Sequence, residues 1–281
     1  NIIHAHQPKA IFFISIITRL LKKPCIITIH SLPNNNFQTY NNIIKGFIVK
    51  ISHHLIKFSA ELMATKIIYL SKFSQNSTLF KNKTIVIPNW LDIDEDLKVN
   101  FNISSNLKFL TIGTVSYNKG IDRLLESLSL INDKNWTLTI LGDIDEKFLK
   151  SYKKLIKKFN IENNVIHLGY KDNLSEYMND ASFFILLSRG ETFGLVFIEA
   201  MSYGLPIICW DIPVVHEIIP NWNFVMSKLN DIHKPVNLFN FEKEKFFKIK
   251  KDNYDYVNKN YNKDIILKFY IEDRKSTRLN S

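Results

Sequence analysis

The sequence predicts an α/β protein with two parallel sheets, one in each half of the chain. Short apolar runs, many of them rich in isoleucine, alternate with longer amphipathic stretches almost from end to end, which is the pattern of strands and helices in parallel sheets. A polar, acidic stretch at Pro88–Asn106 interrupts the alternation and has no clear period. It indicates a linker between two units of the same type.

The first half begins with an apolar run almost at its first residue. We expect strands at Ile2–His4, Cys25–Ile29, Lys66–Leu70 and Thr84–Ile87, and helices at Pro8–Leu21, Asn42–Phe58 and Ser71–Leu79. Because the alternation opens on a strand, we expect the first strands of this domain to be absent from the chain. The first domain, residues 1–88, is therefore interpreted as partial, with residues 89–106 as the linker.

The second half shows a longer alternation that is typical of a complete domain, residues 107–240. Strands are expected at Lys108–Ile112, Thr137–Leu141, Val165–Leu168, Phe183–Leu187 and Ile207–Cys209, and helices at Lys119–Ile131, Glu146–Phe159, Leu174–Met178 and Leu195–Ser202. Two helical patterns, Phe241–Asn258 and Lys263–Ile271, follow in residues 241–272, and we expect them to return toward the first domain. The end, residues 273–281, resembles a translated sequencing adapter and is excluded from fold reasoning.

Composition narrows the class of protein. A hydrophobic content of 46% excludes global disorder. Cys25 and Cys209 fit neither metal-ligand nor disulfide spacing and are expected to be buried free thiols. The longest apolar stretch, Ala10–Leu21, contains Arg19 and is too short to span a bilayer, so a cytoplasmic protein is expected. The net charge of +10 favours acidic partners, but no aromatic-basic motif indicates nucleic-acid binding.

The segment Ser188–Glu217 carries the most specific chemistry. It follows an expected strand, so it lies at a carboxyl end of the sheet, where α/β proteins bind ligands. A helix is expected to begin near Gly194 with Thr192 as its N-cap, and the free N–H groups of its first turn attract anions. Glu191 and Glu199 beside such a site suit hydroxyl groups, because carboxylates accept hydrogen bonds. A sugar nucleotide offers both diphosphate and hydroxyls.

The same residues resemble a known enzyme family. Glu191 and Glu199, with Phe193, Gly194 and Leu195 between them, form the E-x7-E signature of retaining GT-B glycosyltransferases, the glycogen-synthase-like superfamily (glycosyl transferases group 1). The resemblance implies two facing Rossmann-like domains, a nucleoside diphosphate sugar as co-substrate, and no metal or other cofactor. It implies that Glu199 binds the ribose, that Glu191 binds the transferred sugar, and that the backbone from Phe193 to Leu195 contacts sugar and diphosphate.

A second match opens the second domain. The run from Gly113 to Gly120 matches the family's phosphate loop, with Lys119 placed to reach the diphosphate. Thr114 stands where the family has arginine, so that one phosphate contact is lost or supplied from elsewhere. The loops expected beside the nucleotide base contain Gly142, Tyr170 and Lys171.

Three histidines are the candidate site residues of the first domain. His30 ends the strand Cys25–Ile29, where the resemblance implies a histidine that faces the donor sugar, and His4 and His6 resemble an H-x-H beside the acceptor cleft. The expected catalytic residues are thus His30, Glu191 and Lys119. Glu217 is left without a role, because the glycines that precede its counterpart in the family are missing here.

Several alternatives stay open. The helix within residues 42–58 carries an apolar stripe and basic residues, and is either a helix packed on the sheet or a peripheral membrane contact. Its stripe consists of Ile44, Phe47, Ile48, Ile51, Leu55 and Phe58. The expected acceptor is a sugar or a lipid-linked sugar in polysaccharide or glycolipid synthesis. Rival functions are a sugar-nucleotide epimerase and a truncated module that binds without turnover, and we expect residues 1–272 to bind donor but to transfer poorly.

Overall fold

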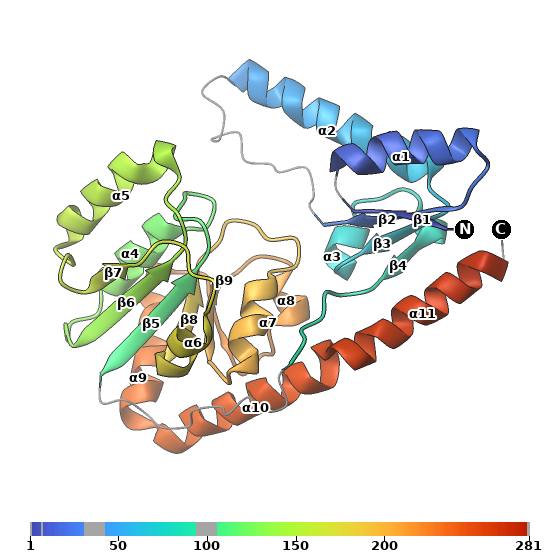
Figure 1. Cartoon of the computed structure of the whole chain (residues 1–281). Helices are drawn as coiled ribbons and strands as arrows, with labels where there is room; N and C mark the ends of the chain where they lie inside the picture. Colours follow the sequence, from blue (N-terminus) through green and yellow to red (C-terminus); the bar gives the residue numbers. More distant parts are fainter. Residues whose placement is uncertain (1, 7, 31–42, 94–105, 280–281) are drawn as a thin grey trace. The chain divides into compact units, whose positions relative to one another are not determined.

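The computed structural model of the 281-residue chain describes residues 2–6, 8–30, 43–93 and 106–279. It divides into two units (Figure 1). Unit 1 contains the chain up to Trp90 together with the segment from Lys263 onward, and unit 2 contains Leu91–Asn262.

Unit 1 is built on a four-stranded parallel sheet in the order β1-β2-β3-β4. The strands are β1 (Ile3–Ala5), β2 (Cys25–Ile29), β3 (Lys66–Tyr69) and β4 (Thr84–Val86), and the helices are α1 (Pro8–Leu20), α2 (Ile43–Met63), α3 (Lys72–Gln75) and α11 (Lys263–Leu279). Alternate residues of each strand point to opposite faces. Ile27 and Ile67 pack under α1 and α2, whereas Ile26 and Ile68 pack against Ile266 of α11, on the other face (Figure 1).

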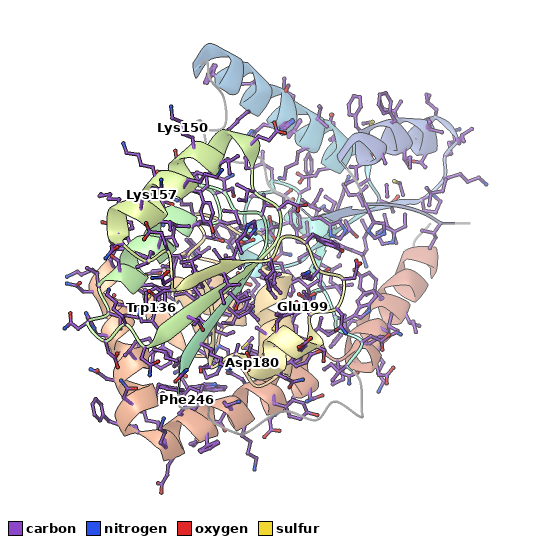
Figure 2. All side chains as sticks on the ribbon, turned by 60° about the vertical axis from the view of Figure 1, so that its left-hand side comes forward. Trp136, Lys150, Lys157, Asp180, Glu199 and Phe246 are labelled. Carbon is purple, nitrogen blue, oxygen red and sulfur yellow. The ribbon has the colours of Figure 1, made fainter. Side chains whose placement is uncertain are left out.

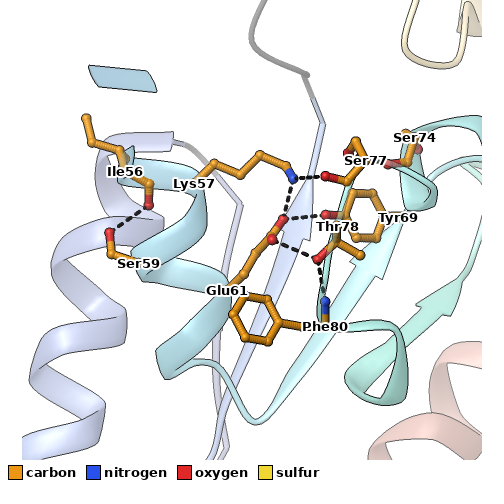
Figure 3. Close-up of polar contacts among 9 residues, drawn as sticks. All are labelled: Ile56, Lys57, Ser59, Glu61, Tyr69, Ser74, Ser77, Thr78 and Phe80. Carbon is orange, nitrogen blue, oxygen red and sulfur yellow. Dashed lines mark hydrogen bonds and ion pairs between the residues drawn. The ribbon is translucent and has the colours of Figure 1, made fainter. Parts of the chain in front are cut away.

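Helix α2 is held against β3 by a buried carboxylate. Glu61 is 2% exposed and accepts hydrogen bonds from the hydroxyls of Tyr69 and Thr78, the latter at 2.8 Å (Figure 3). The ammonium of Lys57 lies 2.7 Å from the same carboxylate and also donates to the carbonyl of Ser77. Because burial and the bond to Glu61 favour the neutral phenol, the pKa of Tyr69 is raised above its usual range. The carboxylate can be buried because Lys57, Tyr69 and Thr78 all contact it.

The apolar stripe expected on this helix does not face the sheet. Phe47, Ile51, Leu55 and Phe58 are all exposed, and Leu55 is 63% exposed. The side chains of Ile44 and Ile48 lie outside the described residues. The residue of α2 in the core of this face is Ala60, further along the helix, so the interpretation that the stripe packs on the sheet is wrong for these four side chains.

Unit 2 contains a six-stranded parallel sheet in the order β10-β9-β8-β5-β6-β7. The strands are β5 (Leu107–Ile112), β6 (Trp136–Leu141), β7 (Val165–His167), β8 (Phe183–Leu186), β9 (Ile207–Trp210) and β10 (Phe224–Met226). The chain runs outward from β5 through β6 to β7, then returns to β8 on the other side of β5. The order therefore reverses between β5 and β8, and ligands of open α/β sheets bind at such a reversal.

Seven α-helices of the described chain flank this second sheet: α4 (Ile121–Ser129), α5 (Glu146–Phe159), α6 (Ser175–Asp180), α7 (Leu195–Ser202), α8 (Val215–Ile218), α9 (His233–Phe241) and α10 (Lys243–Tyr261). Helix α5 shows how they bury one face. Phe148 and Tyr152 turn into the core, while Lys150 and Lys157 project outward (Figure 2). The cation-rich face stays in water, which is the usual arrangement of an amphipathic helix.

Some predicted elements differ from the structure. The helix predicted at Phe241–Asn258 is confirmed as α10, which begins two residues later, at Lys243, and ends at Tyr261, whereas α9, which ends at Phe241, was not predicted. Strand β10 was not predicted, and the helix predicted at Ser71–Leu79 is confined to α3. Helix α11 continues through Leu279, into the segment that sequence reasoning set aside. Both cysteines are buried and free, as expected. Within the described residues, no helix combines the length and the apolar character needed to cross a membrane.

Candidate functional site

Glycines bring three strand ends of unit 2 together. The N–H of Gly113 donates to the carbonyl of Leu141 and the N–H of Gly142 donates to that of Gly169, both at 2.8 Å. Gly142 has φ +136°, and a Cβ built on it would lie 2.3 Å from the carbonyl oxygen of Gly113. Only glycine fits so close an approach of two backbones. The expected site residues Gly113 and Gly142 thus form the floor at the carboxyl ends of β5 and β6.

An ion pair joins the two loops at the strand reversal. Lys119, which follows β5, places its Nζ 2.7 Å from Oε1 of Glu191, which follows β8. The hydroxyl of Ser188 donates to the same oxygen at 2.8 Å. Lys119 and Glu191 lie 72 positions apart in the chain, and their side chains are 31% and 12% exposed. The structure therefore brings together an ammonium and a carboxylate that a phosphate and a sugar hydroxyl can contact.

The helix that follows Glu191 begins at Leu195, and its N-cap is Gly194. The predicted N-cap Thr192 is wrong. Gly194 adopts φ +78°, and a Cβ there would lie 2.7 Å from the ring of Phe197, so the left-handed turn and the packing both require glycine. The ring of Phe193 is buried against that of Tyr261, with centroids 6.0 Å apart, which leaves its backbone as the part that can meet a ligand.

Glu199 lies one turn into α7. It is half-buried, and burial raises the pKa of its carboxyl group above the ordinary value. A carboxylate that has lost part of its hydration gains from hydroxyl donors, which is the partner expected for it.

The remaining expected donor residues lie at the rim of the same edge. Thr114 is exposed beside Gly113. Tyr170 and Lys171 follow β7, and Tyr170 is 69% exposed. A hydrogen bond to Asp172 raises the pKa of Tyr170.

In unit 1 the three expected histidines meet at the carboxyl ends of β1 and β2. Nδ1 of His6 lies 3.1 Å from Nε2 of His30, the rings of His4 and His6 are 4.1 Å apart, and Nε2 of His4 lies 2.8 Å from the hydroxyl of Thr28. Burial and the neighbouring His6 lower the pKa of His30. Among the described residues, no group of three or more His, Cys, Asp or Glu side chains is arranged to hold a metal ion.

Sequence reasoning missed Arg189 and Asp122, whose side chains pair beside Lys119 and Glu191. The only signal for Arg189 was its place between Ser188 and Glu191. Glu217, which had no assigned role, lies exposed in α8.

Comparison with known proteins shows which family the chain resembles. The model of the family "Glycosyl transferases group 1" matches residues 92–234, just over half of the chain. An uncharacterized glycosyltransferase of Methanocaldococcus jannaschii is 30% identical over 244 residues, which are 82% of this chain and 62% of that protein. The O-antigen biosynthesis glycosyltransferase WclY of Escherichia coli is 25% identical over 250 residues, 85% of this chain and 67% of the relative.

Solved structures share the fold. The crystal structure of HepE of Anabaena in complex with UDP and glucose matches with a TM-score of 0.82 at 19% identity, over 98% of this chain and 77% of that chain. The likeness confirms the predicted GT-B fold class. The chain spans 62% of the length of the Methanocaldococcus relative and 59% of that of another curated relative.

Proposed function

This chain belongs to the glycosyl transferases group 1 family, and we propose that it is a retaining glycosyltransferase that moves a sugar from a nucleoside diphosphate sugar to an acceptor hydroxyl. The observation that carries the proposal is the meeting of Lys119 and Glu191 at the strand reversal of unit 2. A cation for the diphosphate and a carboxylate for the sugar then lie at the one edge where such sheets bind ligands.

Leaving-group departure sets the chemistry of the proposed site. When the bond between the anomeric carbon and the diphosphate oxygen breaks, negative charge grows on the diphosphate. The ammonium of Lys119 and the N-terminus of α7, at Leu195, neutralise that charge. Glu191 then holds hydroxyls of the transferred sugar and Glu199 those of the ribose. Retention follows when the acceptor oxygen attacks the anomeric carbon on the face that the diphosphate leaves, and the proton of the acceptor hydroxyl passes to the departing diphosphate oxygen. The proposal includes no metal and no other cofactor.

His30 completes the proposed catalytic set. Its lowered pKa keeps the imidazole neutral at neutral pH, so it can donate or accept a hydrogen bond from a sugar hydroxyl without bringing charge. We assign it to the donor sugar, and His4 and His6 to the acceptor side.

The proposed pathway is cell-surface polysaccharide or glycolipid synthesis, with a sugar or lipid-linked sugar as acceptor. The O-antigen relative supports this class, and the complex of HepE with UDP and glucose makes UDP the first nucleotide to test. Incubation with a panel of nucleoside diphosphate sugars and glycolipid acceptors should release the nucleoside diphosphate and give a product with the donor's anomeric configuration by NMR. An inverted product would contradict retention.

Thr114 supports a second candidate function. It is exposed where the family has a basic side chain, which removes one contact to the diphosphate. The alternative is a module that binds a sugar nucleotide without turnover. Calorimetry and turnover on one preparation separate the two functions, because binding with no released nucleoside diphosphate favours the module.

Peripheral contact with an anionic membrane surface is a further part of the proposal. Phe47 and Leu55 of α2 are exposed, as are Phe13 and Leu20 of α1, and α1 and α2 pack together. Buried in the headgroup region, such side chains anchor a helix whose basic residues attract anionic lipid. Sedimentation with phosphatidylglycerol vesicles, compared with phosphatidylcholine vesicles, tests this contact. Replacement of Leu55 by Asn should weaken it.

A further inference from the structure

Arg189 joins the two loops that carry the proposed donor site. The β5 loop is residues 113–120 and the β8 loop is residues 187–194. Nη1 and Nη2 of Arg189 lie 2.7 and 2.6 Å from the two carboxylate oxygens of Asp122, the second residue of α4. The same guanidinium lies 3.4 Å from the ring centroid of Tyr117 and donates to the carbonyl of Tyr117. The side chain of Arg189, in the β8 loop, thus contacts both the β5 loop and helix α4, which follows it.

The backbones of the two loops also touch. The N–H of Arg189 donates to the carbonyl of Asn118 at 2.9 Å. Gly120 has φ +67°, and a Cβ built on it would lie 1.8 Å from the carbonyl oxygen of Leu187. Contact this close leaves no room for the loops to slide, so the position of Lys119, one residue before Gly120, follows the position of the β8 loop.

We propose that Arg189 is a positioning residue that, through Asp122 and Tyr117, holds the β5 loop against the β8 loop in the register that presents Lys119 and Glu191 to one donor. The inference rests on the proposed function. Arg189 itself lies outside the set of phosphate ligands, because Asp122 engages both terminal nitrogens and balances the charge. It therefore does not replace the arginine that the family has at the place of Thr114.

The chemistry requires arginine. A planar guanidinium makes two parallel hydrogen bonds to a carboxylate and stacks on an aromatic ring at the same time. A lysine ammonium is a point charge, and it cannot make both of these contacts together. The pair is also shielded from water, with Arg189 13% and Asp122 24% exposed, so it is stronger than a pair on the open surface.

The test is binding of UDP to the full chain, measured by calorimetry. We expect Arg189→Met to weaken binding by roughly tenfold or more, because that is the effect of losing one hydrogen bond to a charged group, here the bond from Lys119 to the diphosphate. Arg189→Lys should recover only part of the affinity. Asp122→Asn, which preserves volume, should reproduce the direction of the loss. It is the variant to measure if Arg189→Met fails to fold.

A double-mutant comparison separates positioning from general stability. If Arg189 acts by placing Lys119, then Arg189→Met should cost less than about twofold in a Lys119→Ala background, because the group it positions is gone. Losses that multiply in full would overturn the proposal. Arg189→Met should lower the melting temperature in both backgrounds, whereas its effect on UDP affinity should depend on Lys119. A purely structural role would not make the loss of affinity depend on Lys119.

The chain offers a matched control. Lys108 of β5 pairs with Asp180, which precedes β8, at 2.6 Å, so the same two segments are tied at their opposite ends. Lys108→Met should leave UDP binding unchanged. Wild-type affinity in both Arg189→Met and Asp122→Asn, with a loss in Lys119→Ala, would overturn the positioning role alone. If Lys119→Ala also binds as wild type, the proposed donor site is wrong.

Discussion

The carboxyl edges of the two sheets hold polar residues in different ways. In unit 2, Lys119 and Glu191 lie on two loops that form an ion pair with each other. The close approach of glycines to neighbouring backbone and the Arg189–Asp122 pair fix these loops in place. In unit 1, His6 and His30 meet at the ends of short strands, with ring nitrogens 3.1 Å apart and ring centroids 5.3 Å apart. The proposed diphosphate site needs fixed charges in a rigid frame, whereas a histidine such as His30, whose lowered pKa favours the neutral imidazole, can be placed with less constraint. Five experiments test this difference.

The largest effect is expected from the glycine floor of unit 2. Gly142→Ala should destabilise this unit by about 3 kcal/mol or more, because a methyl group would clash with the Gly113 carbonyl at a backbone angle that alanine rarely adopts. Thermal unfolding measures the loss. Gly190→Ala is the control, since a Cβ there meets no atom within 4 Å and the variant should behave as wild type. Equal melting temperatures for both variants would show that the backbone around Gly142 can accommodate a side chain.

Glu199 tests the proposed ribose contact. Glu199→Ala should weaken binding of a nucleoside diphosphate by roughly 1–3 kcal/mol, the cost of leaving polar partners unpaired. Glu217→Ala, an exposed carboxylate in α8 to which we assign no role, is the control. Unchanged calorimetric affinity in a folded Glu199→Ala variant would remove that role.

The local periodicity of the sequence predicted most of the helices and strands that position these residues. Strand β2 and helices α5 and α7 have the predicted bounds. In α5, Asp145 caps the first turn and Asn160 ends the helix in a left-handed conformation, signals that lie in the sequence itself. Strand β10 has only three residues and exists because it pairs with β9, so nothing local marks it.

The candidate site was predictable where a motif is contiguous, and not where residues meet across the fold. Glu191, Gly194 and Glu199 lie in one short segment. Arg189 and Asp122 are 67 positions apart, and their pairing follows from β8 lying next to β5, a strand order that periodicity does not fix.

Thr114 offers a gain of function. Thr114→Arg should tighten UDP binding by about 1 kcal/mol, or roughly fivefold, since an exposed cation beside the floor gains a charge-assisted bond to phosphate. Thr137→Arg, near the amino end of β6 and so at the opposite edge of the sheet from Thr114, controls for the added charge. If both variants bind equally tightly, the gain comes from net charge and not from position.

The smallest effect concerns the histidines of unit 1. Burial first, and then repulsion by a charged His6, lowers the pKa of His30. His6→Gln removes the second cause but not the first, so NMR titration should show the pKa of His30 rising while it stays below its usual 6.5. His53→Gln removes an exposed imidazole of α2, in the same unit, that is not a cause of the shift, and it should leave the titration unchanged.

The same shift has a consequence for stability. Because the folded-state pKa of His30 is lowered, the unfolded chain binds a proton first as the pH falls below about 6.5, and unit 1 loses stability there. Above that range His30 is neutral in both states and contributes no pH dependence. Hydrogen exchange of the β1 and β2 amides at pH 7.5 and 5.5 measures the loss, which should be smaller in His6→Gln. Equal loss in the variant and the wild type would show that the two imidazoles do not interact and that burial alone lowers the pKa of His30.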